Sequence, residues 1–174
     1  MTMTDNNRVI EIVQDMDTSI SVMYHAGTWL ETSGKKPSKW WKPENLNQQA
    51  LLQYVKPDEF YTVMVNGEQA AAVILQFGQN SQDWKCIDKD NPVSALYIHW
   101  LCVERKYAST GLPKVVMDFA EQKAIENNIS FLRADTNAEI MKLRKVYEDV
   151  GFELVSIEQE DYRKTAFYQR YVKK

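Results

Sequence analysis

The chain has 174 residues, with 21 Lys and Arg against 24 Asp and Glu and a formal net charge of −3. This length is sufficient for one domain whose core needs neither disulfides nor a structural metal, so we expect a single domain over residues 1–174. The near balance of charge provides no broad basic field, which argues against nucleic acid as a partner.

Cysteine usage and hydropathy restrict the class of protein further. The two cysteines, Cys86 and Cys102, belong neither to a CxxC pair nor to a histidine cluster at metal-ligand spacing, so we expect no metal. The polar segment 1–8 lacks the apolar core of a signal peptide, and no apolar run approaches the roughly 20 residues of a membrane span. These features predict a cytoplasmic protein that does not associate with membranes.

The first part of the chain predicts a strand followed by two helices. Residues 8–13 alternate apolar and polar side chains, as a short strand does. Asp15 or Asp17 can cap the next helix and Gly34 can end it. Residues 44–54 fit a second short helix.

A hairpin and a long apolar strand come next. Residues 60–65 and 69–77 predict two strands joined by Asn66 and Gly67, because an Asn-Gly turn accommodates positive φ at both positions. Residues 95–103 carry few charges, which is typical of a strand buried on both faces. We therefore expect this strand to lie centrally in its sheet.

The remaining sequence predicts two helices and three strands. An amphipathic helix begins near Gly111 and has Pro113 in its first turn. Thr136 and Glu139 have the spacing of a capping box, and Gly151 can end the helix that follows. The expected strands are 130–134, 152–157 and 165–172.

This order of elements predicts an α/β (α+β) fold. We expect a single mixed, mainly antiparallel central sheet of roughly six to seven strands, flanked by helices on both sides.

Several segments resemble the GNAT family of N-acetyltransferases. After the hairpin, ALYIHWLCVERKYASTGLPKVVMDFAEQKA, FLRADTN and LRKVYEDVGFELV follow that family's motifs in order, so that the resemblance extends over residues 60–155. The segment around Trp29 and Leu30 resembles the N-terminal arm of members that act on small molecules. The resemblance implies a GNAT-like fold, acetyl-CoA as the co-substrate, and transfer of an acetyl group to a primary amine.

The resemblance also implies where acetyl-CoA binds. The end of the central strand would present its backbone to the acyl carbonyl and the pantetheine arm, and an amide there would stabilise the anion that develops during attack. The turn that follows, with the start of the next helix, would hold the diphosphate on backbone amides. The implied cofactor-binding residues are Leu101, Cys102, Val103, Ser109, Thr110, Gly111, Leu112 and Lys114.

Tyr147 and His99 are the implied catalytic residues. In the family, a tyrosine four residues before Gly-Phe protonates the leaving thiolate, whereas the alternative for Tyr147 is packing on the apolar face of its helix. Some members use a histidine at the position of His99 as general base, and the alternative is a histidine that packs in the core. Cys102 has no His or Asp at a suitable spacing, so we expect direct attack in a ternary complex.

The acceptor pocket is expected between the first two helices, the polar loop 35–43 and the long loop before the central strand. Aromatic and acidic side chains there would attract a cationic amine. The alternative is that the tryptophans pack the loops down and that the acids are solvated surface. The candidate substrate-binding residues are Trp29, Trp40, Trp41, Glu59, Trp84 and Tyr97, with Asp58, Asp83 and Asp88 as further acids.

Two other functions remain open. Acetylation of a protein or peptide terminus requires an open groove instead of a closed pocket. A non-catalytic acyl-CoA-binding regulatory module is favoured by Ala108, Pro113 and Ile140, which depart from the family pattern, because Pro113 has no N–H to offer a phosphate. The partner we expect is a small-molecule amine, and the expected assembly is a monomer or homodimer.

Overall fold

The computed structural model describes residues 1–173. Its strands are β1 (Thr2–Asp5), β2 (Arg8–Gln14), β3 (Phe60–Val65), β4 (Glu68–Gly78), β5 (Ala95–Val103), β6 (Phe131–Asn137), β7 (Glu153–Gln159) and β8 (Lys164–Tyr171). Its helices are α1 (Met16–Thr32), α2 (Gln48–Leu51), α3 (Lys85–Asp88), α4 (Leu112–Glu126) and α5 (Met141–Asp149). Short 3-10 turns occupy η1 (Lys39–Trp41), η2 (Pro43–Asn45), η3 (Pro57–Glu59) and η4 (Arg105–Tyr107).

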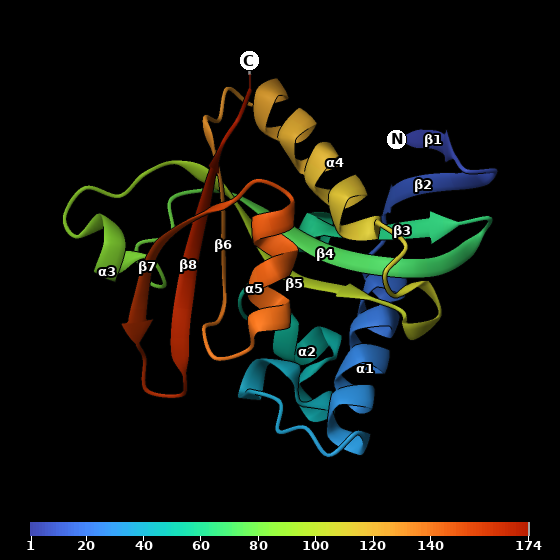
Figure 1. Ribbon diagram of the computed structural model, residues 1–174, viewed down its shortest axis with the longest axis horizontal. Coiled ribbons are helices and arrows are strands. Elements are labelled where there is room, and N and C mark those ends of the chain that lie inside the picture. Colours follow the sequence, from blue (N-terminus) through green and yellow to red (C-terminus); the bar gives the residue numbers. More distant parts are fainter. Residues whose placement is uncertain (174) are drawn as a thin grey trace. The chain divides into compact units, whose positions relative to one another are not determined.

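The strands form one eight-stranded sheet with the order β1-β2-β3-β4-β5-β6-β8-β7 (Figure 1). The pairings of β1 with β2, β2 with β3, β3 with β4, β6 with β8 and β7 with β8 are antiparallel, and β5 pairs in parallel with β6. The predicted class, a single mixed and mainly antiparallel sheet flanked by helices, is confirmed with one strand more than expected. The central position of β5 is also confirmed.

The chain divides into two compact units that alternate along the sequence. The N-terminal unit contains residues 1–74 and 100–112, and the C-terminal unit contains residues 75–99 and the chain from Pro113 onward. Strands β4 and β5 therefore each contribute residues to both units. A single domain over residues 1–174 stays a prediction.

Local signals explain much of the N-terminal unit. The Asp15 carboxylate accepts hydrogen bonds from the amide (3.0 Å) and hydroxyl (2.8 Å) of Thr18, which caps α1 and lowers the pKa of Asp15. After α1, Gly34 has φ +71° and ends the helix as predicted. Asn66 and Gly67 have φ +50° and +80°, so the predicted hairpin is confirmed.

Strand β1 was not predicted. It pairs antiparallel with β2 through a turn at Asn6 and Asn7, whose φ angles are +46° and +64°. Asparagine tolerates the left-handed region, but the strand itself reads Thr-Met-Thr-Asp and carries little apolar pattern. The two asparagines of the turn were therefore a better indication of this hairpin than the residue pattern of β1.

Two predicted helix boundaries were wrong. The helix expected over residues 44–54 is divided into η2 and the four-residue α2, because Asn47 accepts a hydrogen bond from the Ala50 amide (2.9 Å) and starts a new helix there. The capping box of Thr136 and Glu139 does not form. Thr136 lies within β6, and α5 begins after Ile140 without a side-chain cap.

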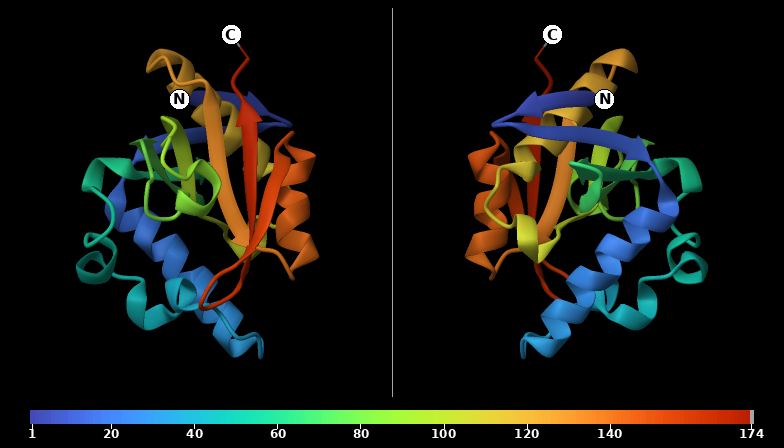
Figure 2. Two further views of the ribbon diagram at one scale, coloured as in Figure 1. Left: turned by 90° about the vertical axis from the view of Figure 1, so that its left-hand side faces the viewer. Right: turned by 90° about the vertical axis from the view of Figure 1, so that its right-hand side faces the viewer.

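The C-terminal unit contains β6, β8 and β7 as neighbouring strands, with α5 alongside (Figure 2). A buried ion pair connects α3 to β6. The Arg133 guanidinium binds both carboxylate oxygens of Asp88, at 2.7 and 2.9 Å, and the two side chains are only 5% and 4% exposed. The same guanidinium lies 4.3 Å from the centre of the Trp84 ring and donates to Gln169. Two-point pairing of this kind offsets the cost of burying both charges.

We expect Asp88→Asn to lower the free energy of unfolding by about 3 kcal/mol, because it leaves the buried Arg133 charge without its anion. Asp90→Asn, which changes an exposed acid two residues away, serves as the control and should have an effect below about 0.5 kcal/mol. Denaturant titration of the three proteins measures both effects. Equal stability of the two variants would show that the ion pair contributes no net stability.

Candidate active site

The central strand contains an irregularity at Trp100. This residue has φ +48°, a region that bulky side chains rarely adopt and that costs on the order of 1–3 kcal/mol. It lies directly before the predicted acyl-binding residues Leu101, Cys102 and Val103. In the C-terminal unit, the pairing of β5 with β6 covers Leu96 to Ile98. The positive φ at Trp100 was not predicted, since tryptophan is not a residue that signals positive φ.

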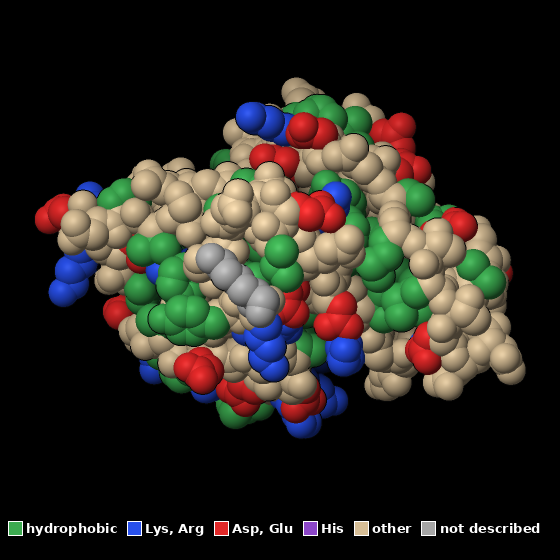
Figure 3. Space-filling model, turned by 90° about the horizontal axis from the view of Figure 1, so that it is seen from above, with side chains coloured by type: hydrophobic (Ala, Val, Ile, Leu, Met, Phe, Trp, Pro, Cys, Tyr) green, Lys and Arg blue, Asp and Glu red, His purple; other side chains and the backbone are tan. Residues whose placement is uncertain are grey.

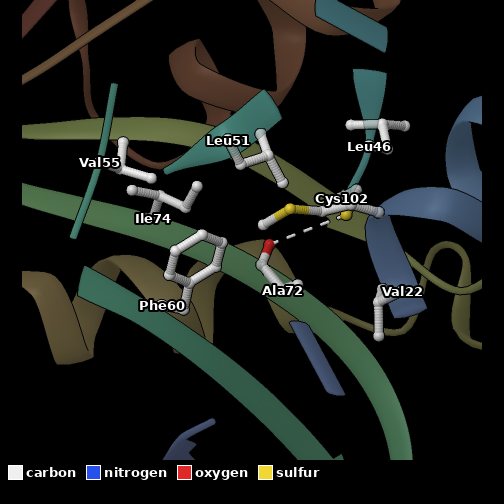
Figure 4. Packing of buried hydrophobic residues seen from close by; sticks show 9 residues of the cluster. Val22, Leu46, Leu51, Val55, Phe60, Ala72, Ile74 and Cys102 are labelled. Carbon is white, nitrogen blue, oxygen red and sulfur yellow. Dashed lines mark hydrogen bonds between the residues drawn. The ribbon is translucent and has the colours of Figure 1, made fainter. Parts of the chain in front are cut away.

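Contacts within the N-terminal unit hold Trp100 in this conformation. Its indole Nε1 donates a hydrogen bond to the Trp40 carbonyl oxygen at 3.0 Å. Its ring packs against a core cluster that includes Leu51, Phe60 and Cys102 (Figure 4). Directly after β5, the Glu104 amide donates to the Ala70 carbonyl at 2.8 Å. Trp100 and the end of the strand are therefore both held by contacts of the N-terminal unit.

Cys102 is a buried residue of that cluster. Its Sγ lies 4.0 Å from the Ala72 carbonyl oxygen, and burial raises the pKa of the thiol (Figure 4). The thiol therefore remains protonated at neutral pH, and a protonated thiol is a poor nucleophile. This geometry favours direct attack by the acceptor over a covalent intermediate on Cys102.

The turn after β5 has two left-handed residues, Ser109 (φ +61°) and Gly111 (φ +84°). The Thr110 hydroxyl donates to the Tyr107 carbonyl at 2.6 Å, so this hydroxyl is already used within the turn. The Arg8 guanidinium donates to the Thr110 carbonyl at 3.2 Å and ties the turn to β2. The amides of Ser109, Gly111 and Leu112 take no part in these bonds. Alternating backbone of this kind forms anion-binding turns.

Lys114 lies in the first turn of α4. Its ammonium forms an ion pair with Asp118 at 2.6 Å, and both side chains are largely exposed. Such a pair contributes little to stability, so the ammonium can exchange its partner for another anion at small cost.

Tyr147 combines packing with a protonated hydroxyl. Its ring stacks on Tyr168, with centroids 5.9 Å apart, and meets Phe152 edge to face at 5.6 Å. Burial raises the pKa of its hydroxyl, and the Asp135 carboxylate raises this pKa further. Within residues 1–173, no hydrogen bond to this hydroxyl is found. Packing and proton donation, given as alternatives by the sequence, are thus compatible.

His99 and Tyr97 lie on one face of β5 in the C-terminal unit. Their rings are nearly parallel, with centroids 6.3 Å apart. The Tyr97 hydroxyl donates to the Val93 carbonyl at 3.1 Å and lies 3.3 Å from the Arg133 guanidinium. Tyr97 therefore belongs to the buried network around the ion pair, which favours packing. The role of His99 stays a prediction.

The tryptophans of the predicted rim have different surroundings. Trp84 is fully buried against Tyr97 and Phe167, so it does not lie at a pocket rim. Trp29 is covered by the Arg105 guanidinium, 4.0 Å from its ring centre, and Trp41 packs against the N-terminal core.

The predicted acids have different surroundings as well. Asp88 is paired with Arg133, Asp83 accepts from Asn80, and the Glu59 carboxylate accepts from the Lys56 amide. These acids therefore have partners other than a bound amine.

Trp40 lines a hollow of about 160 Å³ within the N-terminal unit, which we call the aromatic hollow. Its walls include Trp40, Tyr54, Trp100, Ala50, Leu51 and Lys39. Trp100 and Tyr54 were not predicted as substrate-binding residues. Both are aromatic, and Trp100 belongs to the predicted central strand, which is the one feature of the sequence that could have indicated this role.

Other features of the described chain concern partners. Residues 1–173 contain no group of three or more His, Cys, Asp and Glu side chains arranged to hold a metal. Within the same residues, no helix has the length and apolar character needed to cross a membrane. The face in Figure 3 carries basic and acidic side chains interspersed.

Solved structures with this fold include acetyltransferases. A GNAT family acetyltransferase from Listeria monocytogenes has 20% identity, a TM-score of 0.69, and coverage of 98% of this chain and 99% of that chain. An apo mutant of agmatine N-acetyltransferase has 12% identity, a TM-score of 0.68, and coverage of 93% and 99%. The ribosomal-protein-S18-alanine N-acetyltransferase from Escherichia coli has 16% identity, a TM-score of 0.56, and coverage of 95% and 94%.

Comparison with curated proteins finds no significant match. The sequence matches the family described as acetyltransferase (GNAT) domain over residues 30–172. The chain therefore belongs to the GNAT family, as the motifs indicated. This membership supports an N-acetyltransferase activity in general.

The raised pKa of Tyr147 predicts a pH dependence of stability. The unfolded chain loses this proton near pH 10 while the folded chain retains it, so the wild type should lose stability as pH rises through that value. Between pH 9 and 11, we expect the wild type to lose about 1 kcal/mol relative to Tyr147→Phe. Denaturant titration at several pH values measures the difference. Tyr171→Phe, which changes a tyrosine that is 69% exposed, is the control, and parallel profiles for all three proteins would contradict the prediction.

Proposed function

We propose that this protein transfers the acetyl group of acetyl-CoA directly to the primary amine of a small molecule. The observation that carries the proposal is the left-handed Trp100 directly before Leu101 to Val103, followed by the turn with positive φ at Ser109 and Gly111. Both features lie in the N-terminal unit. They coincide with the segments that the family uses for the thioester and the diphosphate.

The turn suits a diphosphate by its donor chemistry. Ser109 and Gly111 are exposed, and the Thr110 hydroxyl and the Arg8 side chain brace the turn from within. The amides of Ser109, Gly111 and Leu112 would bind the phosphate oxygens, with the adjacent N-terminus of α4 adding a favourable dipole. Lys114 would exchange Asp118 for a phosphate.

The residues around the bend in β5 would act on the acyl carbonyl. Bound acetyl-CoA supplies an activated thioester, and the backbone of Leu101 to Val103 would orient its carbonyl. An amide fixed in this way stabilises negative charge on oxygen by a few kcal/mol, because it needs no reorganisation during the reaction. Cys102 contributes to the position of the strand and not to covalent chemistry.

Tyr147 would hold the proton that the leaving sulfur requires. The hydroxyl is protonated at neutral pH, as an ordinary phenol is, and it would supply its proton as negative charge develops on the departing sulfur. His99 is the candidate base for the ammonium proton of the acceptor, directly or through water, because imidazole titrates near neutrality. Proton removal from the amine and proton delivery to the sulfur would thus be assigned to different side chains.

A small-molecule acceptor is favoured by the aromatic hollow, which has room for one small group. The similar structures include proteins named for agmatine and for a ribosomal protein, so the fold is compatible with either kind of acceptor. An assay of thiol release against small amines and peptides distinguishes them. Turnover restricted to peptides would exclude the proposed acceptor class, and saturable acetyl-CoA binding without any turnover would indicate a binding module.

Tyr147→Phe tests the proton donor. We expect turnover to fall by about ten-fold or more while the Kd for acetyl-CoA changes less than about three-fold, since the ring and its packing remain. Steady-state kinetics and a binding titration measure the two quantities. Tyr171→Phe should leave both unchanged. Turnover equal to that of the wild type would reduce Tyr147 to a packing residue.

Pro113→Ala tests the phosphate turn. The substitution restores an N–H at the second residue of α4, next to the amides of Gly111 and Leu112, and we expect acetyl-CoA to bind about three-fold or more tightly. Pro92→Ala, in the loop before β5, is the matched control. A weaker or unchanged affinity would show that an amide at position 113 does not reach the diphosphate.

A further inference from the structure

The aromatic hollow has the character of a ring-binding site. Trp40 meets Tyr54 edge to face, with centroids 5.1 Å apart and planes at 82°. It meets Trp100 in the same way, at 5.8 Å and 85°. The rings thus form a connected wall of faces and edges, which is the arrangement that aromatic rings prefer for further aromatic partners.

The size of the hollow limits its occupant. A volume of about 160 Å³ is close to that of an apolar cavity, about 150 Å³, that accepts one benzene molecule. Ala50 and Leu51 of α2 add apolar lining, and Asn45 and Gln53 contribute polar side chains. The hollow therefore has room for a single flat ring.

The charge of the hollow favours a neutral ring over a cation. Lys39 lines the hollow, and its ammonium lies 4.7 Å from the centre of the Trp40 ring. Among the described residues that line the hollow, none is acidic. A cationic group placed inside would therefore face a like charge and gain no carboxylate partner.

The position of the hollow relates it to the acyl-binding strand. Trp100 lines the hollow, and the next residue, Leu101, begins the segment assigned to the acyl carbonyl. The same stretch of β5 therefore contributes to the hollow and to the acyl-binding segment. A ring joined to an amine by a short aliphatic chain is the kind of acceptor that could use both.

We propose that the aromatic hollow binds the ring of the acceptor and that the acceptor is an arylalkylamine. This inference rests on the proposed function and specifies the substrate class. The ring occupies the hollow while the amine remains outside it, away from Lys39. Alkylamines of equal length lack the flat group that the three aromatic side chains recognise.

A pair of matched amines tests the inference. With acetyl-CoA and a thiol-release assay, phenethylamine should give a kcat/KM at least ten-fold higher than hexylamine. Tyr54→Ala, which removes one wall, and Ala50→Phe, which fills the hollow, should lower kcat/KM for phenethylamine about ten-fold. Both variants should leave the Kd for acetyl-CoA within about two-fold, which shows that the fold and the cofactor site are intact. Tyr24→Ala, which removes an exposed tyrosine on α1 that is not among the lining residues, should change neither.

The outcomes separate this inference from the proposed function. If both amines react equally and the two hollow variants behave as the wild type, the inference is overturned and the acetyltransferase function stands. If acetyl-CoA binds but no amine or peptide is acetylated, the proposed function is overturned. In that case ligand-observed NMR with phenethylamine decides the hollow: saturation of its ring protons that disappears in Ala50→Phe supports ring binding, and saturation unchanged by the substitution overturns it.

Discussion

The left-handed backbone at Trp100 is the constraint on which the N-terminal unit depends. Its cost is offset by the indole hydrogen bond to the Trp40 carbonyl and by packing against the core cluster. The loop that supplies this carbonyl is itself held close to α1. A Cβ at Gly27 would lie 2.6 Å from the Trp41 carbonyl oxygen and 2.5 Å from Leu46, so only glycine permits the approach. Contacts therefore run without a break from Gly27 through the loop around η1 to the bend in β5. This series of contacts connects the aromatic hollow with the acyl-binding strand.

Burial has the same electrostatic effect at two side chains and different chemical consequences. It raises the pKa of Cys102 and of Tyr147, so both groups stay neutral. For the thiol this removes nucleophilicity, whereas the phenol remains a neutral hydroxyl that can donate a hydrogen bond to a departing sulfur. The Arg133 and Asp88 pair is the opposite case. There, both groups are buried as charges, and the network of Tyr97, Gln169 and Trp84 around them makes this tolerable. The C-terminal unit thus uses ionic burial for structure and keeps its candidate proton donor uncharged.

The sequence predicted those features whose cause is local. The Asn-Gly hairpin, the cap at Asp15 and the apolar run of β5 each depend on neighbouring residues, and each is confirmed. Features set by distant contacts were missed. Trp84 and Trp40 have the same side chain and both follow polar loops in the sequence. Trp84 is fully buried beside Phe167, whereas Trp40 lines the aromatic hollow, and no local sequence pattern distinguishes the two. Likewise, nothing within a few residues of Trp100 indicates positive φ, because the partner that fixes it is 60 positions earlier in the chain. The sequence motif of β5 and its turn was sufficient to indicate the family, whereas the positive φ at Trp100 that shapes this segment could not be predicted from the sequence.

The charge beside the aromatic hollow reverses the electrostatic expectation for the acceptor. Acidic side chains would concentrate an ammonium but would also raise its pKa, and an amine must lose its proton before it attacks. A lysine at the hollow lowers both the local concentration of an ammonium and its pKa. For an arylalkylamine seated as we propose, Lys39 disfavours entry of the ammonium end into the hollow, while the ring supplies the binding free energy through contact area. Recognition then depends on the part of the acceptor that does not react, and the positive charge decides which end of the acceptor enters the hollow.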